Sequence, residues 1–246
     1  MSPMASIVIP AYDEGESIRP LLEAISRKVS TDFEVLVVFD DPSDSTAPFV
    51  RAYAEKDPRM KPTLNTYGRG PAQALRYGIE HASAPVVVVM MADASDDPEQ
   101  VDDMVRLVMD GNVVAAASRY MRGGRQLGGP LIKRTLSRMA GLSLCYLARV
   151  GTHDATSSFK AYSSEFVRTV GIDSQAGFEM GIELVSKARR ARLGVAEIPT
   201  VWRDRTQGES RFRVVEWIPH YVRWYLFAFG RRLTPVEIGS RERRGK

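Results

Sequence analysis

The stretch PVVVVMMADASDDPEQ, residues 85–100, carries a run of four valines and two methionines into a cluster of acidic residues. A run this apolar predicts a strand that is buried on both faces, as at the centre of a parallel sheet. Asp97 before Pro98 fits the N-cap of a following helix, with Gln100 as its reciprocal partner three residues on. The stretch therefore predicts a central strand, an acidic loop and a helix.

The helix cap leaves three polar residues of the acidic loop unexplained, namely Asp93, Ser95 and Asp96. Carboxylates and hydroxyls at the carboxyl end of a parallel strand stand where open α/β sheets bind their ligands. The loop is therefore predicted to form a metal and phosphate site.

Strands and helices alternate along the rest of the chain. Residues 6–10 and 33–39 are short β-branched runs, and residues 17–29 between them have helical spacing. Further strands are predicted from Leu64, at 113–118, around Phe159 and at 195–204, and further helices at 47–55, 72–81, 101–109, 131–149 and 178–192. The alternation predicts one α/β domain with a mostly parallel central sheet and helices on both faces.

Composition narrows the class of protein. A chain of 246 residues with 44% hydrophobic content can bury the core of one large domain. The single cysteine, Cys145, excludes a disulfide framework and predicts a buried thiol in a reduced, intracellular protein. The three histidines have no metal-ligand or nucleophile–base spacing. The N-terminal residues lack the pattern of a secretory signal, so the predicted location is cytoplasmic.

The C-terminal part has the one stretch that approaches a membrane segment. Residues 214–230 are rich in aromatic side chains, but Glu216, Pro219 and Arg223 interrupt them, so a membrane span is not predicted. The stretch suits either packing on the domain or lying in the interface of an anionic membrane. The net charge of +4 is modest, and no nucleic acid is predicted as a partner.

Two common nucleotide-binding loops are absent from the sequence. The first predicted strand is followed by PAYDEGES, where a dinucleotide-binding fold would have G-x-G-x-x-G, and no G-x-x-x-x-G-K-[ST] occurs. Hydride transfer and P-loop hydrolysis are therefore disfavoured.

Six segments, in order along the chain, resemble the landmarks of family 2 glycosyltransferases with the GT-A fold. They are IVIPAYDEGESI, VVFDDPSDST, GRGPAQAL, MADASDDPE, SRYMRGG and DRTQGESRF, between Ile7 and Phe212. The chain is most similar to the polyprenyl (dolichyl) phosphate mannose and glucose synthases. The resemblance implies a catalytic domain at 1–212, an amphipathic aromatic helical segment at 213–232 and a basic, flexible tail at 233–246.

The activity implied is the inverting transfer of a hexose, with mannose favoured, from a GDP- or UDP-sugar to a polyprenyl phosphate. The resemblance also implies Mg²⁺ or Mn²⁺ as cofactor and a peripheral position on the cytoplasmic face of a membrane. A phosphate acceptor is already largely anionic at pH 7, so this transfer requires no strong general base.

The resemblance implies a nucleotide-sugar site in the first half of the chain. It assigns the base and ribose to Pro10, Tyr12, Glu14 and Asp41, with Asp40 adjacent. Carboxylates accept hydrogen bonds from a base and from ribose hydroxyls, and an aromatic ring packs on the base. Taken alone, the acidic residues after the second strand would be ordinary turn formers.

The acidic motif departs from the family pattern. That pattern is D-A-D with a glutamine two residues later, and here it becomes Met91, Asp93 and Ser95. A thioether is a poor ligand for Mg²⁺. The predicted metal ligands are therefore Asp93, Ser95 and Asp96, with water completing the shell.

Arginines supply the remaining implied site. Asp93, Arg119, Arg134 and Arg205 form the implied catalytic set, because several guanidinium groups can grip the donor diphosphate and the acceptor phosphate. The donor phosphates are also assigned to Ser210 and Arg211. Arg119, Arg134 and Asp154 are assigned to the acceptor.

Two other functions remain open on the sequence. One is a family 2 transferase that acts on a soluble hydroxyl compound, with Asp154 as the general base. The other is a catalytically silent module that binds a nucleotide sugar or a membrane, which Met91 alone suggests.

Overall fold

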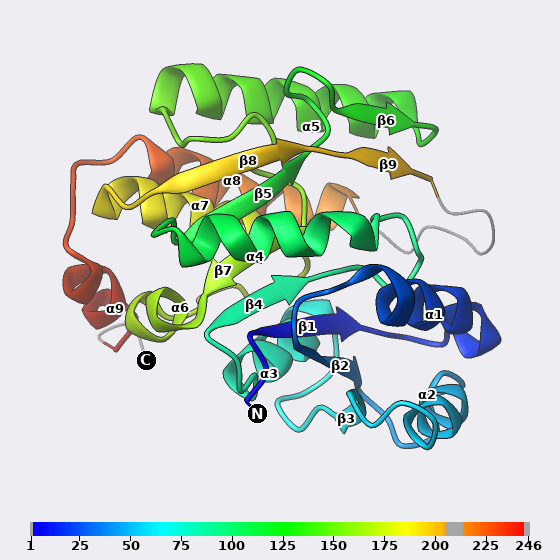
Figure 1. Ribbon diagram of the computed structural model, residues 1–246. Coiled ribbons are helices and arrows are strands. Elements are labelled where there is room, and N and C mark those ends of the chain that lie inside the picture. Colours follow the sequence, from blue (N-terminus) through cyan, green and yellow to red (C-terminus); the bar gives the residue numbers. More distant parts are fainter. Residues whose placement is uncertain (1, 205–213, 244–246) are drawn as a thin grey trace.

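The computed structural model describes residues 2–204 and 214–243, without the side chains of 214–216 and 240–243. Its centre is a seven-stranded sheet in the order β3-β2-β1-β4-β7-β5-β8 (Figure 1). Every neighbouring pair is parallel except the two made by β7, which runs antiparallel between β4 and β5. The strands are β1 Ala5–Pro10, β2 Phe33–Phe39, β3 Met60–Leu64, β4 Val86–Val89, β5 Val114–Ser118, β7 Lys160–Ser163 and β8 Val195–Pro199.

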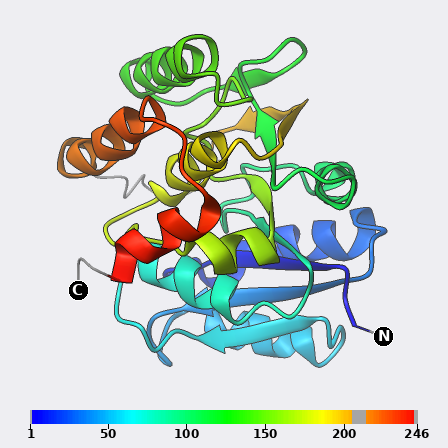
Figure 2. The same ribbon diagram turned by 90° about the vertical axis from the view of Figure 1, so that its left-hand side faces the viewer.

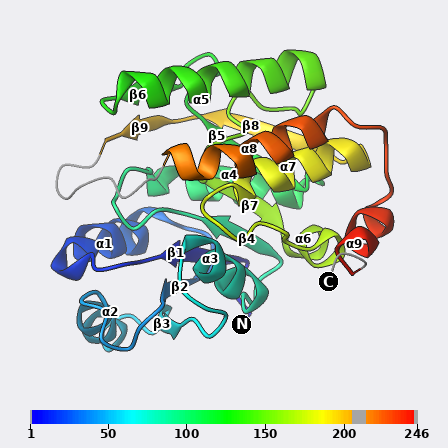
Figure 3. The same cartoon turned by 180° about the vertical axis from the view of Figure 1, so that it is seen from behind.

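Helices cover both faces of this sheet, as Figures 1 and 3 show from opposite sides, so the predicted fold class is confirmed. A smaller parallel sheet pairs β6, Arg125–Leu127, with β9, Val201–Arg203. The last turn of α5 continues as a π-helix, Leu144–Ala148. The helices are α1 Arg19–Lys28, α2 Ala47–Ala54, α3 Pro71–Glu80, α4 Val101–Met109, α5 Leu131–Ser143, α6 Ser164–Val170, α7 Met180–Ala191, α8 Val214–Ala228 and α9 Pro235–Arg243.

The central strands are apolar throughout because they lie between two cores. Val8 of β1 belongs to the core that includes Leu75 of α3, whereas Ile7 belongs to the core that includes Leu22 of α1. Side chains alternate across a strand, so a strand covered on both faces needs apolar residues at every position. The four valines of β4 meet this requirement, and all of them are fully buried.

Helix α3 packs on the sheet through a glycine. A Cβ atom at Gly78 would come within 2.4 Å of Val8 Cγ1 and 3.0 Å of Val38 Cγ2. Any larger residue would therefore push α3 away from β1 and β2. The cost of a glycine inside a helix is offset here by close packing.

The helix cap in the acidic stretch forms as predicted, but its reciprocal partner does not. Asp97 accepts a hydrogen bond from the Glu99 amide at 3.2 Å, and Pro98 begins a turn of 3₁₀-helix before α4. The Gln100 side chain donates instead to the Pro199 carbonyl at 2.8 Å. It therefore ties the start of α4 to the end of β8.

Several boundaries differ from the sequence-based expectation. Leu64 ends β3 rather than beginning it, because this edge strand is largely exposed and has no apolar run to reveal it. The strand predicted at 195–204 is divided at Thr200 between the main sheet and the small one. Helix α6 was not expected, because its seven residues follow β7 directly.

The C-terminal stretch expected to be a flexible tail contains helix α9. Leu233 and Ile238 are 4% and 3% exposed and pack into the core with α6 and α7, which explains why a polar segment is ordered. Cys145 is half-buried rather than buried, and burial raises the pKa of its thiol. The division of the chain at residues 212 and 232 stays a prediction.

A buried carboxylate holds the amino edge of the sheet together. Glu34 of β2 accepts hydrogen bonds from Ser6 Oγ at 2.6 Å, the Ser83 amide at 2.9 Å and Ser83 Oγ at 2.7 Å, and it pairs with Lys61. Burial acts to raise the pKa of Glu34, but the hydrogen bonds from Lys61, Ser6 and Ser83 outweigh it and lower the pKa to about 2. The ionised form is thus favoured by folding.

We expect Glu34→Gln to lower the free energy of unfolding by about 2 kcal/mol at pH 7, allowing for partial screening by solvent. Because the pKa is lowered in the folded state, this stabilisation is present above the unfolded pKa and is lost as the pH falls towards 2. Urea unfolding at pH 7 and in acid measures it. Glu23→Gln, at an exposed position of α1, is the matched control. Equal effects of the two substitutions at pH 7 would contradict the role of Glu34.

Candidate active site

Four of the loops that carry predicted site residues leave the carboxyl edge of the parallel strands, on the right-hand side of Figure 1. Register pairs Val8 with Val89, and Lys160 with both Val89 and Ala116. Since β7 is antiparallel, its first residue, Lys160, lies at the edge where β1, β4 and β5 end. The loops after these strands and after β2 therefore surround one region.

The acidic loop after β4 has a constrained geometry. Asp93 Oδ1 accepts a hydrogen bond from the Ser95 amide at 3.1 Å. Ala94 between them has a φ of 56°, in the left-handed region that costs a non-glycine residue about 1 kcal/mol or more. The fold thus holds Asp93 and Ser95 in a fixed, strained turn.

The loop contains a polar atom that the fold itself does not satisfy. Ser95 Oγ is buried and has no hydrogen-bond partner within the described parts of the chain. Leaving a buried hydroxyl without a partner costs about 1–3 kcal/mol. Oxygen atoms of Asp93 and Ser95 make a donor set that suits a hard divalent cation. These residues therefore fit the metal that the sequence resemblance implies.

Asp96 lies deeper than Asp93. It is 7% exposed, and its Oδ2 accepts a hydrogen bond from the Met91 amide at 3.0 Å. Burial is the main reason that the pKa of Asp96 is raised, to about 7. The Met91 hydrogen bond opposes this effect, as do the charges of Arg119 and Lys160, while Asp93 adds to it. Within residues 2–204 and 214–243, no group of three acidic, histidine or cysteine residues forms a ready metal cage.

Arg119 and Asp154 form a buried ion pair behind the acidic loop. Arg119 Nε and Nη2 contact the two carboxylate oxygens at 2.6 and 2.8 Å, and the Arg119 amide adds a third bond at 3.0 Å. Asp154 is fully buried. Burial acts to raise the pKa of Asp154, but the charge and hydrogen bonds of Arg119 prevail and lower it.

A hydroxyl network fixes the same guanidinium. Arg119 Nη2 donates to Ser137 Oγ of α5 at 3.2 Å, and Ser137 Oγ also contacts Tyr120 Oη at 3.0 Å and Thr156 Oγ1 at 2.7 Å. Arg119 Nη1 has no hydrogen bond with the residues that the structure describes. Asp154 and Ser137 thus fix Nε and Nη2, and the guanidinium also lies over the Tyr120 ring, with Cζ 4.9 Å from the ring centroid.

Lys160 is a buried cation that sequence reasoning missed. Its Nζ donates to the carbonyls of Ala155, at 3.3 Å, and Ser157. Burial lowers the pKa of Lys160 to about 7, against the raising effects of Asp154 and Asp96. The one available signal was a lysine between Phe159 and Ala161 in a short apolar strand. Arg119 and the protonated form of Lys160 place positive charge near Asp96 of the acidic loop.

The loops after β1 and β2 are tied to each other. The buried Asp44 accepts hydrogen bonds from the Asp13 amide at 3.0 Å and from the Thr46 amide at 2.8 Å. Thr46 Oγ1 accepts a bond from the Glu14 amide at 3.0 Å. These contacts place Tyr12, which is 58% exposed, beside the end of β2.

The two neighbouring aspartates after β2 have different roles. Asp40 accepts hydrogen bonds from Asn65 Nδ2 at 2.7 Å and from the Gly70 amide at 2.6 Å, so it secures the loop that precedes α3. Asp41 is 40% exposed and pairs with the exposed Arg69 at 2.8 Å. The hydroxyl and amide of Ser43, with Arg69, lower the pKa of Asp41. Asp41 therefore presents an ionised carboxylate at the surface.

Of the remaining predicted residues, some lie on β1 and α5 and others lie outside the described residues. Pro10 ends β1 and is buried, and Arg134 lies half-buried on α5, one turn before Ser137. Arg205, Ser210 and Arg211 lie outside the described residues. The Arg203 amide contacts the Ser95 carbonyl at 3.3 Å, so the chain preceding them passes the acidic loop.

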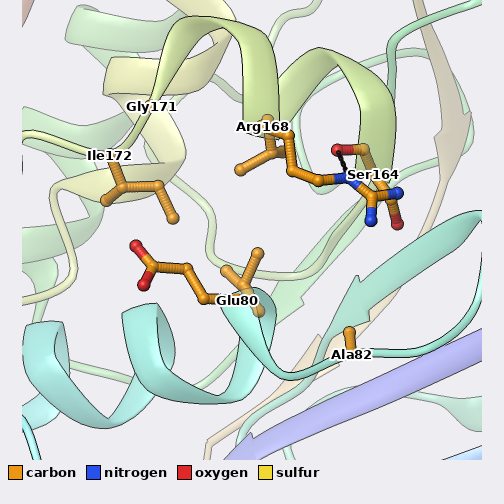
Figure 4. Close-up of a pocket in the computed structure, with 8 residues that line it drawn as sticks. Glu80, Ala82, Ser164, Arg168, Gly171 and Ile172 are labelled. Atoms are coloured by element: carbon orange, nitrogen blue, oxygen red, sulfur yellow. Dashed lines mark hydrogen bonds between the residues drawn. The ribbon is translucent and has the colours of Figure 1, made fainter.

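A cavity of about 190 Å³ lies at the opposite edge of the sheet, between the end of α3 and α6 (Figure 4). It is lined by Ile79, Glu80 and Ile172 among others, and Arg168 Nε donates to the Ser164 carbonyl beside it at 3.2 Å. The Glu80 carboxylate forms an ion pair with Arg76 at 2.8 Å. Because the cavity lies at the opposite edge of the sheet, it is separate from the candidate active site.

Fold and site together define a class of protein, the GT-A glycosyltransferases, to which the structural neighbours of the chain belong. The model of the family "Glycosyl transferase family 2" matches residues 6–171, and the chain belongs to this family. The resemblance expected from the six sequence landmarks is confirmed.

Relatives match over most of the chain. A dolichol-phosphate mannosyltransferase of Pyrococcus furiosus is 29% identical over 89% of this chain, which spans 62% of that protein's length. An undecaprenyl-phosphate mannosyltransferase of Micrococcus luteus is 29% identical over 90% of this chain and 93% of its own. A dolichol-phosphate mannosyltransferase of Saccharomyces cerevisiae is 27% identical over 94% of this chain and 90% of its own.

Among solved structures, the fold is similar to that of glucosyl-3-phosphoglycerate synthase from Mycobacterium tuberculosis, in complex with Mn²⁺, UDP-glucose and phosphoglyceric acid. The TM-score is 0.67 at 17% identity, with 94% of this chain and 81% of that chain covered. At this identity the likeness shows the fold alone.

Proposed function

We propose that this glycosyltransferase moves a hexose, mannose, from a GDP- or UDP-sugar to a polyprenyl phosphate, with inversion at the anomeric carbon. The observation that carries the proposal is the buried pair of Arg119 with Asp154. A hydroxyl acceptor would need a general base, and Asp154 is bound at both oxygens and has a lowered pKa. A phosphate acceptor is already anionic and needs none. The names of the relatives support the same acceptor.

In this proposal the two termini of the Arg119 guanidinium have different tasks. Nε and Nη2 are held by Asp154 and Ser137, and Nη1 is directed to the acceptor phosphate, with Arg134 on the adjacent α5. Asp154 acts through Arg119 and does not touch the acceptor. It is therefore a positioning residue rather than an acceptor-binding one.

Asp93 and Ser95 would hold the divalent cation, Mg²⁺ or Mn²⁺, and the deeper Asp96 would add negative charge in its ionised form, which burial disfavours by raising its pKa to about 7. Solved structures of the Mycobacterium tuberculosis synthase contain Mn²⁺ or Mg²⁺, which supports divalent-metal use. The cation supplies charge neutralisation for the leaving diphosphate. Met91 removes one oxygen ligand, so substrate phosphates and water make up a larger share of the shell.

The donor is assigned to the loops after β1 and β2 and to the segment after β9. Asp41 and Glu14 accept hydrogen bonds from the nucleoside, Tyr12 packs on the base, and Pro10 shapes the floor. Arg205, Ser210 and Arg211 are proposed to bind the diphosphate. In the reaction, the acceptor phosphate oxygen attacks the anomeric carbon while the bond to the nucleoside diphosphate breaks, and no proton needs to move.

A lipid acceptor requires access from a membrane, and two adjacent helices offer a suitable face. Leu136 and Met139 of α5 are 50% and 65% exposed, and Val222 and Leu226 of α8 are 45% and 63% exposed. Tyr225 Oη donates a hydrogen bond to Ser143 Oγ at 3.0 Å and so joins the two helices, whose ribbons are drawn in Figures 1 and 2. Recurrence at three- and four-residue intervals puts these side chains on one face of each helix.

The burial of helix α8 shows that it packs on the domain and is compatible with the membrane interface as well. Trp224 and Ala228 are 3% and 0% exposed and pack on the domain, whereas Val222 and Leu226 face outward. No helix in the described part of the chain is both long and apolar enough to cross a bilayer. We propose peripheral attachment to the cytoplasmic face of a membrane through the exposed apolar face of α5 and α8.

An acceptor comparison tests the proposed function. Purified protein receives a labelled GDP-mannose or UDP-glucose with Mn²⁺ and, in detergent micelles, either polyprenyl phosphate or the same polyprenol without phosphate. We expect label in the organic phase only with the phosphate, because the uncharged alcohol lacks both the nucleophilic charge and the partner for Arg119. Transfer to the alcohol, or to a soluble sugar at a comparable rate, would contradict the proposal.

A further inference from the structure

A second cavity lies at the opposite edge of the sheet from the active site and has a volume of about 510 Å³. It is open to solvent and is bordered by the ends of the π-helix, α7 and α8 and by the start of β8, on the left-hand side of Figure 1. Five arginines line it, namely Arg149, Arg189, Arg192, Arg231 and Arg232. We call it the arginine pocket.

The positive charge of the arginine pocket is not balanced by the protein. Within the described parts of the chain, no carboxylate oxygen lies within 4.0 Å of any of these five guanidinium groups. Arg189 bonds to the carbonyls of Ala148, at 2.7 Å, and Gly230, at 3.3 Å. The pocket thus concentrates like charges, which creates a positive potential that attracts anions.

Capping of helix ends accounts for only part of this charge. The C-termini of the π-helix, α7 and α8 meet at the pocket, and each carries a partial charge of roughly −0.5. Three such ends supply roughly −1.5 against five guanidinium groups, so a net charge of roughly +3.5 remains. Helix capping explains Arg189, which bonds to two terminal carbonyls, but not the full set.

Two of the arginines stand at positions that favour glycine. Arg149 and Arg192 each end a helix with a φ of 57°. This left-handed conformation costs a non-glycine residue about 1 kcal/mol or more. The other described non-glycine residues with a positive φ are Asp13 and Ala94, both at the candidate active site. Among the described residues, non-glycine residues with a positive φ thus occur only at this pocket and at the candidate active site, which is where backbone strain tends to be retained.

Exposed apolar residues adjoin the pocket along the chain. Leu147 and Phe229 are 70% and 43% exposed, and each is next in sequence to a residue, Ala148 or Gly230, whose carbonyl Arg189 binds. A small hydrophilic anion would gain nothing from contact with these apolar side chains. Guanidinium groups beside apolar side chains match the interface of a membrane, where phosphates lie next to acyl chains.

We propose that the arginine pocket binds the phosphate headgroups of anionic membrane lipids, at a site separate from the sugar-transfer site. The inference does not depend on the sugar-transfer reaction. Ser137 contacts Arg119 at the active site, and Arg149 lies twelve residues farther along the same helical segment. At 1.5 Å per residue this separates the two by about 18 Å. Headgroup binding would therefore hold the whole length of α5 against the lipid surface.

Vesicle sedimentation tests the proposal with paired substitutions. Arg192→Gln with Arg232→Gln removes two exposed pocket charges that make no hydrogen bond with described residues. Arg27→Gln with Arg51→Gln removes two exposed charges from α1 and α2 and is the matched control. We expect the native protein to bind phosphatidylcholine vesicles that contain phosphatidylglycerol more tightly than pure phosphatidylcholine vesicles. The pocket variant should bind the mixed vesicles about 10- to 30-fold more weakly, and the control within about 3-fold of the native protein.

Two outcomes would overturn the proposal. One is an equal loss of vesicle binding in the pocket and control variants, which would indicate that the positive charge of the whole protein, and not a specific site, attracts the vesicles. The other is stabilisation of the native protein by inorganic phosphate without any preference for phosphatidylglycerol vesicles, which would assign the pocket to a soluble anion. Transfer to polyprenyl phosphate in detergent micelles should remain unchanged in the pocket variant. Failure of transfer by the native protein would concern the proposed function and not this site.

Discussion

Replacing Asp93 by asparagine is expected to lower the rate of sugar transfer at least about 100-fold. The substitution keeps the size of the side chain and an oxygen that can accept the Ser95 hydrogen bond, but it removes the negative charge. Loss of one preorganised electrostatic contact to a developing charge typically costs about 100- to 1000-fold. Because Met91 already stands in place of one family ligand, the loop has few other charged groups that could replace Asp93.

The rate is measured at saturating donor with polyprenyl phosphate and Mn²⁺. Asp103→Asn is the matched control, since the Asp103 side chain on α4 is 50% exposed and forms an ion pair only with the neighbouring Arg106 among the described residues. The control should stay within about 2-fold of the native rate, the range expected of an exposed pair. An Asp93 variant as active as the control would show that the acidic loop does not take part in transfer.

Asp154→Asn is expected to lower the free energy of unfolding by about 3–5 kcal/mol, because it leaves the buried charge of Arg119 without its partner. For a chain of this length the corresponding fall in Tm is about 10 °C. Asp154 is fully buried and holds Arg119 through three hydrogen bonds, so water cannot replace it at low cost. Thermal and urea unfolding measure the loss.

A double substitution separates the ion pair from general packing. Arg119→Met together with Asp154→Leu removes both charges, and we expect it to be more stable than Asp154→Asn alone. It should nevertheless be inactive, because Arg119 no longer reaches the acceptor. An Asp154→Asn protein as stable as the native one would show that the buried pair does not fix Arg119.

Local patterns in the sequence were sufficient to predict the layered fold. The valines of β4 required cover on both faces, and the alternation of strands and helices implied a parallel sheet. The acidic loop was recognisable because helix capping explained Asp97 and left Asp93 and Ser95 without a structural task. These inferences depend on neighbours within a few residues, which the sequence displays directly.

Pairings between distant segments could not be predicted in the same way. The Arg119–Asp154 pair joins residues 35 positions apart, and it forms because the antiparallel β7 brings the loop before it to the edge of β5. Lys160 is buried for the same reason. An isolated strand pattern cannot show that helices and neighbouring strands close over both faces of such a residue.

Short or weakly apolar elements were the other source of error. Strand β3 is an exposed edge strand, and α9 is anchored by only a few apolar residues, including Leu233 and Ile238. The arginine pocket was not predicted either, because its arginines come from three separate helix ends. Each of these features depends on tertiary contacts rather than on local periodicity.

Calorimetric titration of the nucleoside diphosphate, with and without Mn²⁺, tests the central claim most directly. GDP and UDP are compared first, and the tighter ligand is then titrated into the native protein and into Asp93→Asn. We predict that Mn²⁺ strengthens binding to the native protein by about 10-fold or more, in keeping with a charge-assisted contact to phosphate, and that Asp93→Asn abolishes this gain. An equal gain from Mn²⁺ in both proteins, or none in the native protein, would contradict a cation held at Asp93.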